Sequence, residues 1–489
     1  MFTESPERPG SVFTYQYPDD GKSARRRVAT RIGHAYIRAM ARRPVVLIHG
    51  YSDRGESFLP WRDSLVAAGY QAHDIPVCSY QTLTNEISVK DVAEGFDRAL
   101  RERAGLAAGE PFDALVHSTG MLVLRDWLTT YDERRDRLRH LVALAPATFG
   151  SPIAHKGRSW LGALFKGRRE LGPDFLEAGN EILDALELAS RFTWDLAHRD
   201  LLGDEATYGP TRSTPFAFVL IGAQGYSGLK KLIGEPGSDG VVRWAGCSLN
   251  TRKIIIDLTR DPARPRGEDR TSIAPWSNVD VPMIPLAGLD HGSILSAPSE
   301  QAVSLVLAAL EVNSAADFDA WQKRAARETA GTRAGMDEWQ QFVIRCVDER
   351  GDPVPDWFLQ LLTADGDRLE PFDADVHAYG ADPSLRCFHV NLSRLPESRR
   401  RTLQLRLIAS SGSALVGYHG VGSEKFPLGD AAPDDAGKWD ACLSFASVIG
   451  DEAVKFFYPF TTTLLELRLN REPLPLSGAN RIAGFLESG

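Results

Sequence analysis

A regular alternation of strand-like and helix-like segments constrains the fold of this chain more than any other feature. From about residue 40 to 312, short apolar runs alternate with longer amphipathic ones. The runs that we predict to be strands are 44–50, 70–80, 112–118, 138–147, 216–224 and 281–288, and the predicted helices are 57–68, 87–105, 119–130 and 299–311. Strands separated by helices pair in parallel, so the pattern predicts an α/β fold whose mostly parallel sheet has helices on both faces.

The chain changes character after residue 312. Residues 313–338 are polar and helix-forming, and we interpret them as a helical linker. From 339 to 489, short strand-like runs such as WFLQLLTA are separated by turn-forming segments such as DERGDPVPD, and no helical periodicity connects them. This pattern predicts an antiparallel, sandwich-like C-terminal β domain. Residues 1–39 would form an N-terminal extension before a catalytic domain spanning 40–312.

Composition and charge argue against several classes of function. The chain has 56 basic and 65 acidic side chains and a net charge of −9, which disfavours nucleic acid as a partner because phosphate binding needs a basic surface. The five cysteines form no CxxC pair and no histidine or carboxylate cluster has metal-ligand spacing, so we expect neither a metal nor another cofactor. No segment resembles a signal peptide or a membrane span, which predicts a cytoplasmic protein, with signal-independent export left open.

The segment DALVHSTGMLVLRDWL, residues 113–128, joins a predicted strand to a predicted helix at Ser118. A nucleophilic serine needs such a strained turn, because the turn lifts its hydroxyl above the sheet and places it at a helix N-terminus. The strain requires small residues two positions before and two positions after the serine. Gly120 meets this requirement after it, whereas Val116 stands where a glycine is usual. The alternative is that Ser118 is only a polar loop residue.

A second motif, IHGY, follows the first predicted strand. Acyl transfer to a serine passes through an oxyanion, which is commonly stabilised by two backbone N–H groups. We expect the amides of Tyr51 and Thr119 to supply them, and we expect the neighbouring residues His49, Gly50 and His117 to support the two turns. The alternative is that HG is a simple turn after a strand.

A serine nucleophile also needs a base and an acid that orients the base. His291, in LAGLDHGSIL, follows a predicted strand and precedes the last helix of the alternating region. In this kind of site the order along the chain is serine, acid, histidine. Asp239, in the turn-rich GEPGSDGVVRW, has the right position for the acid, while Asp280 and Asp290 are weaker candidates. Ser118 would attack, His291 would act as general base and then acid, and Asp239 would hold the imidazole.

Together these motifs resemble the α/β-hydrolase superfamily, in particular its lipase and esterase branch. The resemblance is carried by LIHGY, VHSTG with MLVLRDWL, LAPATFGSP, GSDGVV and LDHGSI, which occur in the family's order across roughly residues 40–312. It implies a doubly wound sheet with a helical cap insert, the same catalytic triad and oxyanion amides, and an acyl-enzyme. The sequence departs from the family at Val116 and Met121, which replace glycines, and the resemblance does not extend to the C-terminal β domain.

An insert at about 151–213, between two predicted strands, would form the cap. Within it, GRSWLGALFKGRRE places four apolar side chains on one helical face, and basic residues flank that face. The four apolar residues are Trp160, Leu161, Leu164 and Phe165. An amphipathic helix with a basic rim suits an anionic lipid surface, so the segment predicts a lid that contacts lipid. The alternative is a cap that contacts only protein.

These features favour a serine hydrolase that cleaves carboxylic esters of lipids: a lipase, carboxylesterase or phospholipase A. The expected partners are an acyl-ester or lipid substrate and, transiently, a membrane surface, while the ligand of the C-terminal domain stays unknown. Three alternatives remain open. They are an acyltransferase or thioesterase with the same triad, a catalytically silent hydrolase fold that acts as an interaction module, and an exported antibacterial phospholipase effector.

Overall fold

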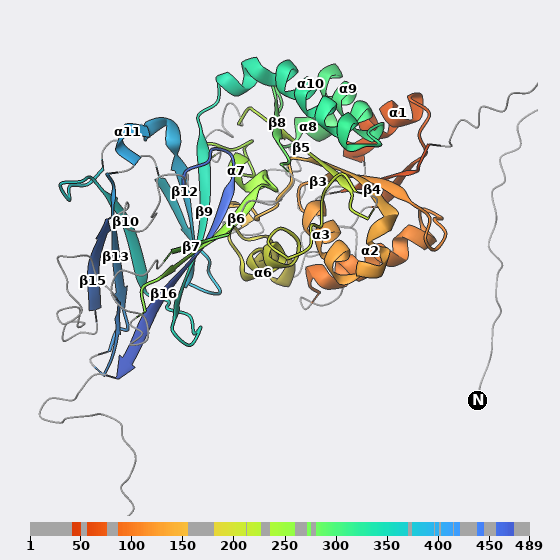
Figure 1. Ribbon diagram of the computed structural model, residues 1–489. Helices are drawn as coiled ribbons and strands as arrows, with labels where there is room; N and C mark the ends of the chain where they lie inside the picture. The colour runs from red at the N-terminus through yellow and green to blue at the C-terminus, as the bar shows by residue number, and fades with distance from the viewer. Residues whose placement is uncertain are drawn as a thin grey trace, which may run out of the picture. The chain divides into compact units, whose positions relative to one another are not determined.

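Figure 1 shows the computed structural model of the protein. The described residues are 42–49, 56–75, 87–154, 180–211, 213–225, 235–259, 271–274, 280–369, 374–395, 397–400, 402–413, 415–420, 438–444 and 456–473. The predicted N-terminal extension, 1–39, lies outside them, and so do six of the predicted site residues: Gly50, Tyr51, Trp160, Leu161, Leu164 and Phe165.

The first half of the described chain builds a parallel sheet of six strands in the order β2-β1-β3-β4-β5-β8. The strands are β1 (Val45–Ile48), β2 (Ala72–Ile75), β3 (Phe112–His117), β4 (Leu138–Leu144), β5 (Phe216–Gly222) and β8 (Met283–Leu286). Every neighbouring pair is parallel. All residues of β1, β3 and β5 are buried, because the sheet is covered on both faces, and this explains the unbroken apolar character of β1 and β5. The predicted α/β sheet is confirmed.

Helices form the covering layers on the two faces (Figure 1). One face packs α2 (Val89–Glu102) and α3 (Gly120–Thr130), and the other packs α1 (Leu59–Ala67), α8 (Ser293–Ser296), α9 (Glu300–Leu310) and α10 (Ala315–Ala334). Short 3-10 turns occur at η1 (Glu56–Phe58) and η3 (Asp132–Arg137). Helix α2 begins at a reciprocal capping box between Ser88 and Asp91, and its periodic apolar residues Val92, Phe96 and Leu100 are the buried ones.

Helix α10 occupies most of the segment predicted to be a linker. Its residues Phe318, Trp321 and Ala325 recur at helical spacing and are buried in the core that also contains α9. The indole N–H of Trp321 donates to the Leu305 carbonyl oxygen of α9 at 3.0 Å. The helix therefore packs into the layer that covers one face of the parallel sheet.

The strands after residue 338 contribute to two further sheets. The smaller sheet is antiparallel and contains β10 (Trp357–Leu362), β13 (Gln404–Ser410) and β15 (Lys438–Ser444). The larger sheet has the order β11-β12-β9-β16-β6-β7, with β14 beside β16. Its strands are β6 (Thr251–Asp257), β7 (Thr271–Ile273), β9 (Trp339–Asp348), β11 (Ala374–Ala378), β12 (Leu385–Asn391), β14 (Val416–His419) and β16 (Thr462–Pro473), and η7 (Leu392–Arg394) and α11 (Glu397–Arg400) follow β12. One apolar core draws its residues from both sheets, which confirms the predicted sandwich-like arrangement.

The larger sheet joins segments that are far apart in the sequence. Strands β6 and β7 lie in the chain between β5 and β8, yet β16 pairs in parallel with β6 on one side and with β9 on the other. Figure 1 shows these strands side by side. The sheet therefore contains parallel pairs in addition to the predicted antiparallel ones.

The described part of the predicted cap insert contains α5 (Asn180–Leu186) and α6 (Arg191–Asp200). A fully buried ion pair ties α6 to α3: Arg125 Nε and Nη2 donate to the two carboxylate oxygens of Asp200 at 2.7 and 2.8 Å. The Tyr208 hydroxyl donates to the same carboxylate at 2.8 Å, and Arg125 also donates to the Thr148 carbonyl oxygen. The fully buried Arg125 guanidinium is thus hydrogen-bonded to two groups of the protein interior, the Asp200 carboxylate and the Thr148 carbonyl.

We expect Asp200→Ala to destabilise the protein by about 3–5 kcal/mol, because it leaves the Arg125 guanidinium buried without its counter-charge. Urea unfolding followed by tryptophan fluorescence measures the change. Asp195→Ala is the matched control on the same helix, because Asp195 forms a half-exposed pair with Arg191 and its loss should cost no more than about 1 kcal/mol. Equal destabilisation by the two variants would contradict the assignment.

Candidate active site

Ser118 lies on the turn between β3 and α3, in a left-handed backbone conformation with φ of 53°. Such a value is unfavourable for a residue with a Cβ and persists only where the surroundings enforce it. Here the Ser118 amide donates to the Leu144 carbonyl oxygen at 3.2 Å, and the Ser118 carbonyl oxygen accepts from the Ala147 amide at 3.2 Å. The end of β4 therefore holds the serine in the strained turn that the sequence predicted.

Gly120 is required because β1 passes directly over the turn. A Cβ on Gly120 would lie 2.8 Å from the Ile48 carbonyl oxygen and 3.0 Å from that of His49, too close for any side chain. Val116, which replaces the usual glycine before the serine, is fully buried in the core on the α2 and α3 side of the sheet, as is Met121. Both departures from the hydrolase pattern are thus accommodated by packing.

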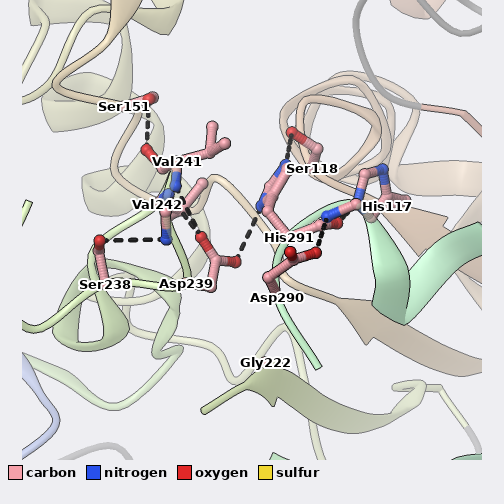
Figure 2. A network of polar contacts seen from close by, with 12 residues as sticks. His117, Ser118, Ser151, Gly222, Ser238, Asp239, Val241, Val242, Asp290 and His291 are labelled. Atoms are coloured by element: carbon pink, nitrogen blue, oxygen red, sulfur yellow. Dashed lines mark hydrogen bonds and ion pairs between the residues drawn. The ribbon is translucent and has the colours of Figure 1, made fainter. Parts of the chain in front are cut away.

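Figure 2 shows that the fold brings the three predicted catalytic residues together. The Ser118 Oγ lies 3.1 Å from His291 Nε2, and His291 Nδ1 lies 2.8 Å from Asp239 Oδ2. All three side chains are buried. A carboxylate only accepts hydrogen bonds, so the neutral imidazole that carries its proton on Nδ1 fits this geometry, and its Nε2 then faces the serine hydroxyl as an acceptor.

The loop that carries Asp239 orients its carboxylate with backbone groups. The Asp239 Oδ1 accepts from the amides of Val241 and Val242 at 3.0 and 2.8 Å, which leaves Oδ2 directed at His291. Ser151, which is not among the predicted site residues, supports this loop by donating to the Val241 carbonyl oxygen at 2.7 Å. The LAPATFGSP motif, in which Ser151 stands, was the available signal.

The loop of His291 is fixed from two sides. The His291 amide donates to the Asp239 carbonyl oxygen at 3.0 Å, and His117 Nε2 lies 3.0 Å from the His291 carbonyl oxygen. Gly222, at the end of β5, allows the loop to approach, because a Cβ there would lie 2.5 Å from the Leu289 carbonyl oxygen. The side chain of His117, predicted as a support residue, therefore contacts the backbone of His291.

The two weaker candidates for the acid are engaged elsewhere. Asp290 Oδ1 accepts from the amides of Gly292 and Ser293, so this side chain caps the turn after His291. Asp280 accepts from the Asn250 side-chain amide. The imidazole of His291 is instead hydrogen-bonded to Asp239.

Of the two residues predicted to supply oxyanion amides, Thr119 lies within the described residues and Tyr51 lies outside them. Thr119 is the N-cap of α3, and an amide at a helix N-terminus is suited to an anion. The amides of Met121 and Leu122 instead donate to the carbonyl oxygens of Ser118 and Thr119 at 3.1 and 2.9 Å. His49 is buried at the end of β1 and packs edge-on against Phe58, with 4.5 Å between ring centroids.

Within the described ranges, no group of three His, Cys, Asp or Glu residues could hold a metal ion, and no helix is long and apolar enough to cross a membrane.

The parallel sheet, the strained serine turn and the hydrogen-bonded Ser118, His291 and Asp239 side chains define an α/β-hydrolase fold, as the sequence predicted. Among solved structures, the chain is similar to phospholipase PlaB from Legionella pneumophila. Two PlaB structures, one of them in complex with thio-NAD, align with a TM-score of 0.68 and 22% identity, covering 91% of this chain and 98% of PlaB. The mature lipase BlEst2 from Bacillus licheniformis aligns over 56% of this chain and 94% of its own, with a TM-score of 0.34 and 16% identity.

At 22% identity, the similarity to PlaB shows the fold alone. No family model and no curated protein matches the sequence. Because the PlaB alignment covers nearly all of both chains, the shared fold extends beyond the parallel sheet to the C-terminal β region.

We expect Gly120→Ala to destabilise the protein by about 1–3 kcal/mol, because the added methyl group would overlap a backbone carbonyl of β1 that cannot move without disturbing the sheet. Gly331→Ala, on the exposed face of α10, is the matched control and should be neutral or stabilising by up to about 1 kcal/mol. Urea unfolding compares the two. A tolerated Gly120→Ala would show that β1 does not restrict the serine turn.

Proposed function

We propose that the protein is a serine hydrolase that cleaves carboxylic ester bonds of lipids, as a lipase or phospholipase A does. The observation that carries the proposal is the buried chain of hydrogen bonds from Ser118 Oγ through His291 to Asp239. Ser118 stands on a strained turn, and the strain has no other evident use. A polar, strained and buried arrangement of this kind is costly to maintain, and such features concentrate at reactive sites.

In the proposed mechanism, Ser118 Oγ attacks the ester carbonyl carbon while His291 Nε2 takes the hydroxyl proton. The oxyanion of the tetrahedral intermediate accepts hydrogen bonds from the amides of Thr119 and Tyr51. His291 then gives the proton to the leaving alcohol oxygen, and the acyl group remains on Ser118. Water repeats the sequence, releasing the carboxylic acid and restoring the serine, while Asp239 stabilises the imidazolium in both halves.

The proposal of a lipid substrate rests on two further observations. PlaB, whose fold this chain shares over nearly its full length, is a phospholipase. The insert also carries the amphipathic segment with Trp160, Leu161, Leu164 and Phe165 and a basic rim. That composition suits the surface of an anionic membrane, so the segment would bring the site to aggregated lipid.

We expect Ser118→Ala to abolish turnover and Asp239→Asn to reduce kcat about ten-thousand-fold, because the asparagine amide would favour the wrong imidazole tautomer. Hydrolysis of short and long p-nitrophenyl esters and of phospholipid vesicles measures both, and circular dichroism checks folding. Asp290→Asn is the discriminating comparison, since Asp290 adjoins His291 but caps a turn. A larger loss with Asp290→Asn than with Asp239→Asn would overturn the assignment of the acid. Acyl transfer to an added alcohol without hydrolysis would favour an acyltransferase.

Replacing Trp160 and Phe165 with serine should lower turnover on anionic phospholipid vesicles at least several-fold more than turnover on a short soluble ester. The reason is that the variant has less apolar surface to bury in the lipid, which weakens binding to the vesicle and leaves the chemistry at Ser118 unchanged. Parallel assays on the two substrates, together with vesicle co-sedimentation, provide the measurement. Equal losses on both substrates would show that these side chains contact only protein.

A further inference from the structure

Residues 235–243, which we name the acid loop, lie against the C-terminal β region. The loop folds back on itself, because Ser238 and Arg243 form an isolated antiparallel bridge and the Trp244 amide donates to the Gly237 carbonyl oxygen at 2.9 Å. Asp239 stands at its tip. The two sides of this narrow loop are therefore hydrogen-bonded to each other between its base and Asp239.

Arg243, at the base of the acid loop, connects it to the larger β sheet. Its guanidinium is 1% exposed and donates to Glu235 Oε2 at 2.9 Å, at the opposite end of the loop. The same group forms an ion pair with Asp375 on β11 and donates to Cys387 Sγ on β12 at 3.6 Å. One buried cation thus closes the loop and ties it to two adjacent strands that follow it by more than 130 residues.

A second contact supports the other side of the acid loop. A Cβ on Gly237 would lie 2.7 Å from the ring of Trp339 and 2.8 Å from that of His389, so the loop backbone rests directly on these side chains. The two rings are stacked, with 4.3 Å between centroids. Burial, and secondarily the positive charge of Arg243, lowers the pKa of His389 well below its usual range, so the ring is neutral. The acid loop therefore sits on an uncharged aromatic surface of the C-terminal sheet.

We infer that Arg243 is a positioning residue for the catalytic acid, and that the C-terminal sheet, through Asp375, Trp339 and His389, is a required part of the active-site framework. The route from Arg243 to the acid is short. Its neighbour Val242 donates the 2.8 Å bond to Asp239 Oδ1, and the Asp239 amide donates back to the Val242 carbonyl oxygen at 3.1 Å. A rotation of the backbone at residue 243 would turn the carboxylate away from His291.

The kinetic test of this inference rests on the proposed function. Arg243→Met should lower kcat for a short soluble ester about 10- to 100-fold with little change in KM, because the variant misplaces the acid without touching the substrate. In an Asp239→Asn background the same substitution should have less than about a twofold effect, since the acid no longer acts. An equal loss in both backgrounds would overturn the inference.

Further variants separate positioning from folding. Asp375→Asn removes the negative charge of the ion pair with β11, on a side chain that is 54% exposed, and should lower kcat in the same direction, whereas Asp375→Glu, which keeps the charge, should retain activity. Arg406→Met is the matched control. Arg406 pairs with Asp440 in the smaller sheet of the same β region and its loss should leave kcat unchanged. If Asp375→Asn has full activity, the tie to the sheet does not position the acid.

A measurement without substrate distinguishes failure of this inference from failure of the proposed function. The proton shared by His291 Nδ1 and Asp239 Oδ2 should give a strongly downfield proton NMR signal in the full chain, and Asp239→Asn should abolish it. Arg243→Met should shift or broaden this signal even if the protein hydrolyses no ester. An unchanged signal in Arg243→Met would overturn the inference, whatever the activity of the wild-type protein.

Discussion

The simultaneous pairing of β16 with β6 and β9 is the constraint on which the rest of the structure depends. Leu465 of β16 lies opposite Ile254 on one side and Ile344 on the other, and all three side chains are buried in one core. A strand from the end of the described chain thus separates a strand of the hydrolase region from the first C-terminal strand. The larger sheet is complete only when both regions are folded and in register, which couples their stabilities.

This coupling reaches the candidate site because the acid loop ends next to β6. The short helix α7 (Trp244–Cys247) directly follows the loop, and Thr462 at the start of β16 donates to the Ala245 carbonyl oxygen at 3.0 Å. The serine and the histidine are instead placed by the parallel sheet, at the ends of β3 and after β8. Ser118 and His291 are therefore placed by the hydrolase fold alone. Asp239 is also held by the larger sheet of the C-terminal β region, which the hydrolase fold does not require.

The features that could be predicted from the sequence are those that short stretches of chain determine. The six parallel strands, the turn at Ser118 and the choice of Asp239 and His291 as its neighbours all follow from short motifs and their spacing. The sequence could not predict the contacts of Arg243 with Asp375 or the pairing of β6 with β16, because the partners lie more than 130 residues apart and no local pattern specifies them. Helix α10 was interpreted as a linker because its buried residues, Phe318 and Trp321 among them, are few within a polar segment.

Two buried arginines occupy the places where later elements join the hydrolase core. Arg125 binds Asp200 where α6 meets α3, and Arg243 binds Glu235 and Asp375 where the acid loop meets the C-terminal sheet. A buried ion pair adds little net stability over apolar packing, because desolvation offsets the attraction, but separating its partners is strongly destabilising because it leaves an uncompensated buried charge. An apolar contact would permit sliding. The use of charge at these two junctions therefore favours geometric precision over stability. Geometric precision is what the hydrogen bonds that join Ser118, His291 and Asp239 require.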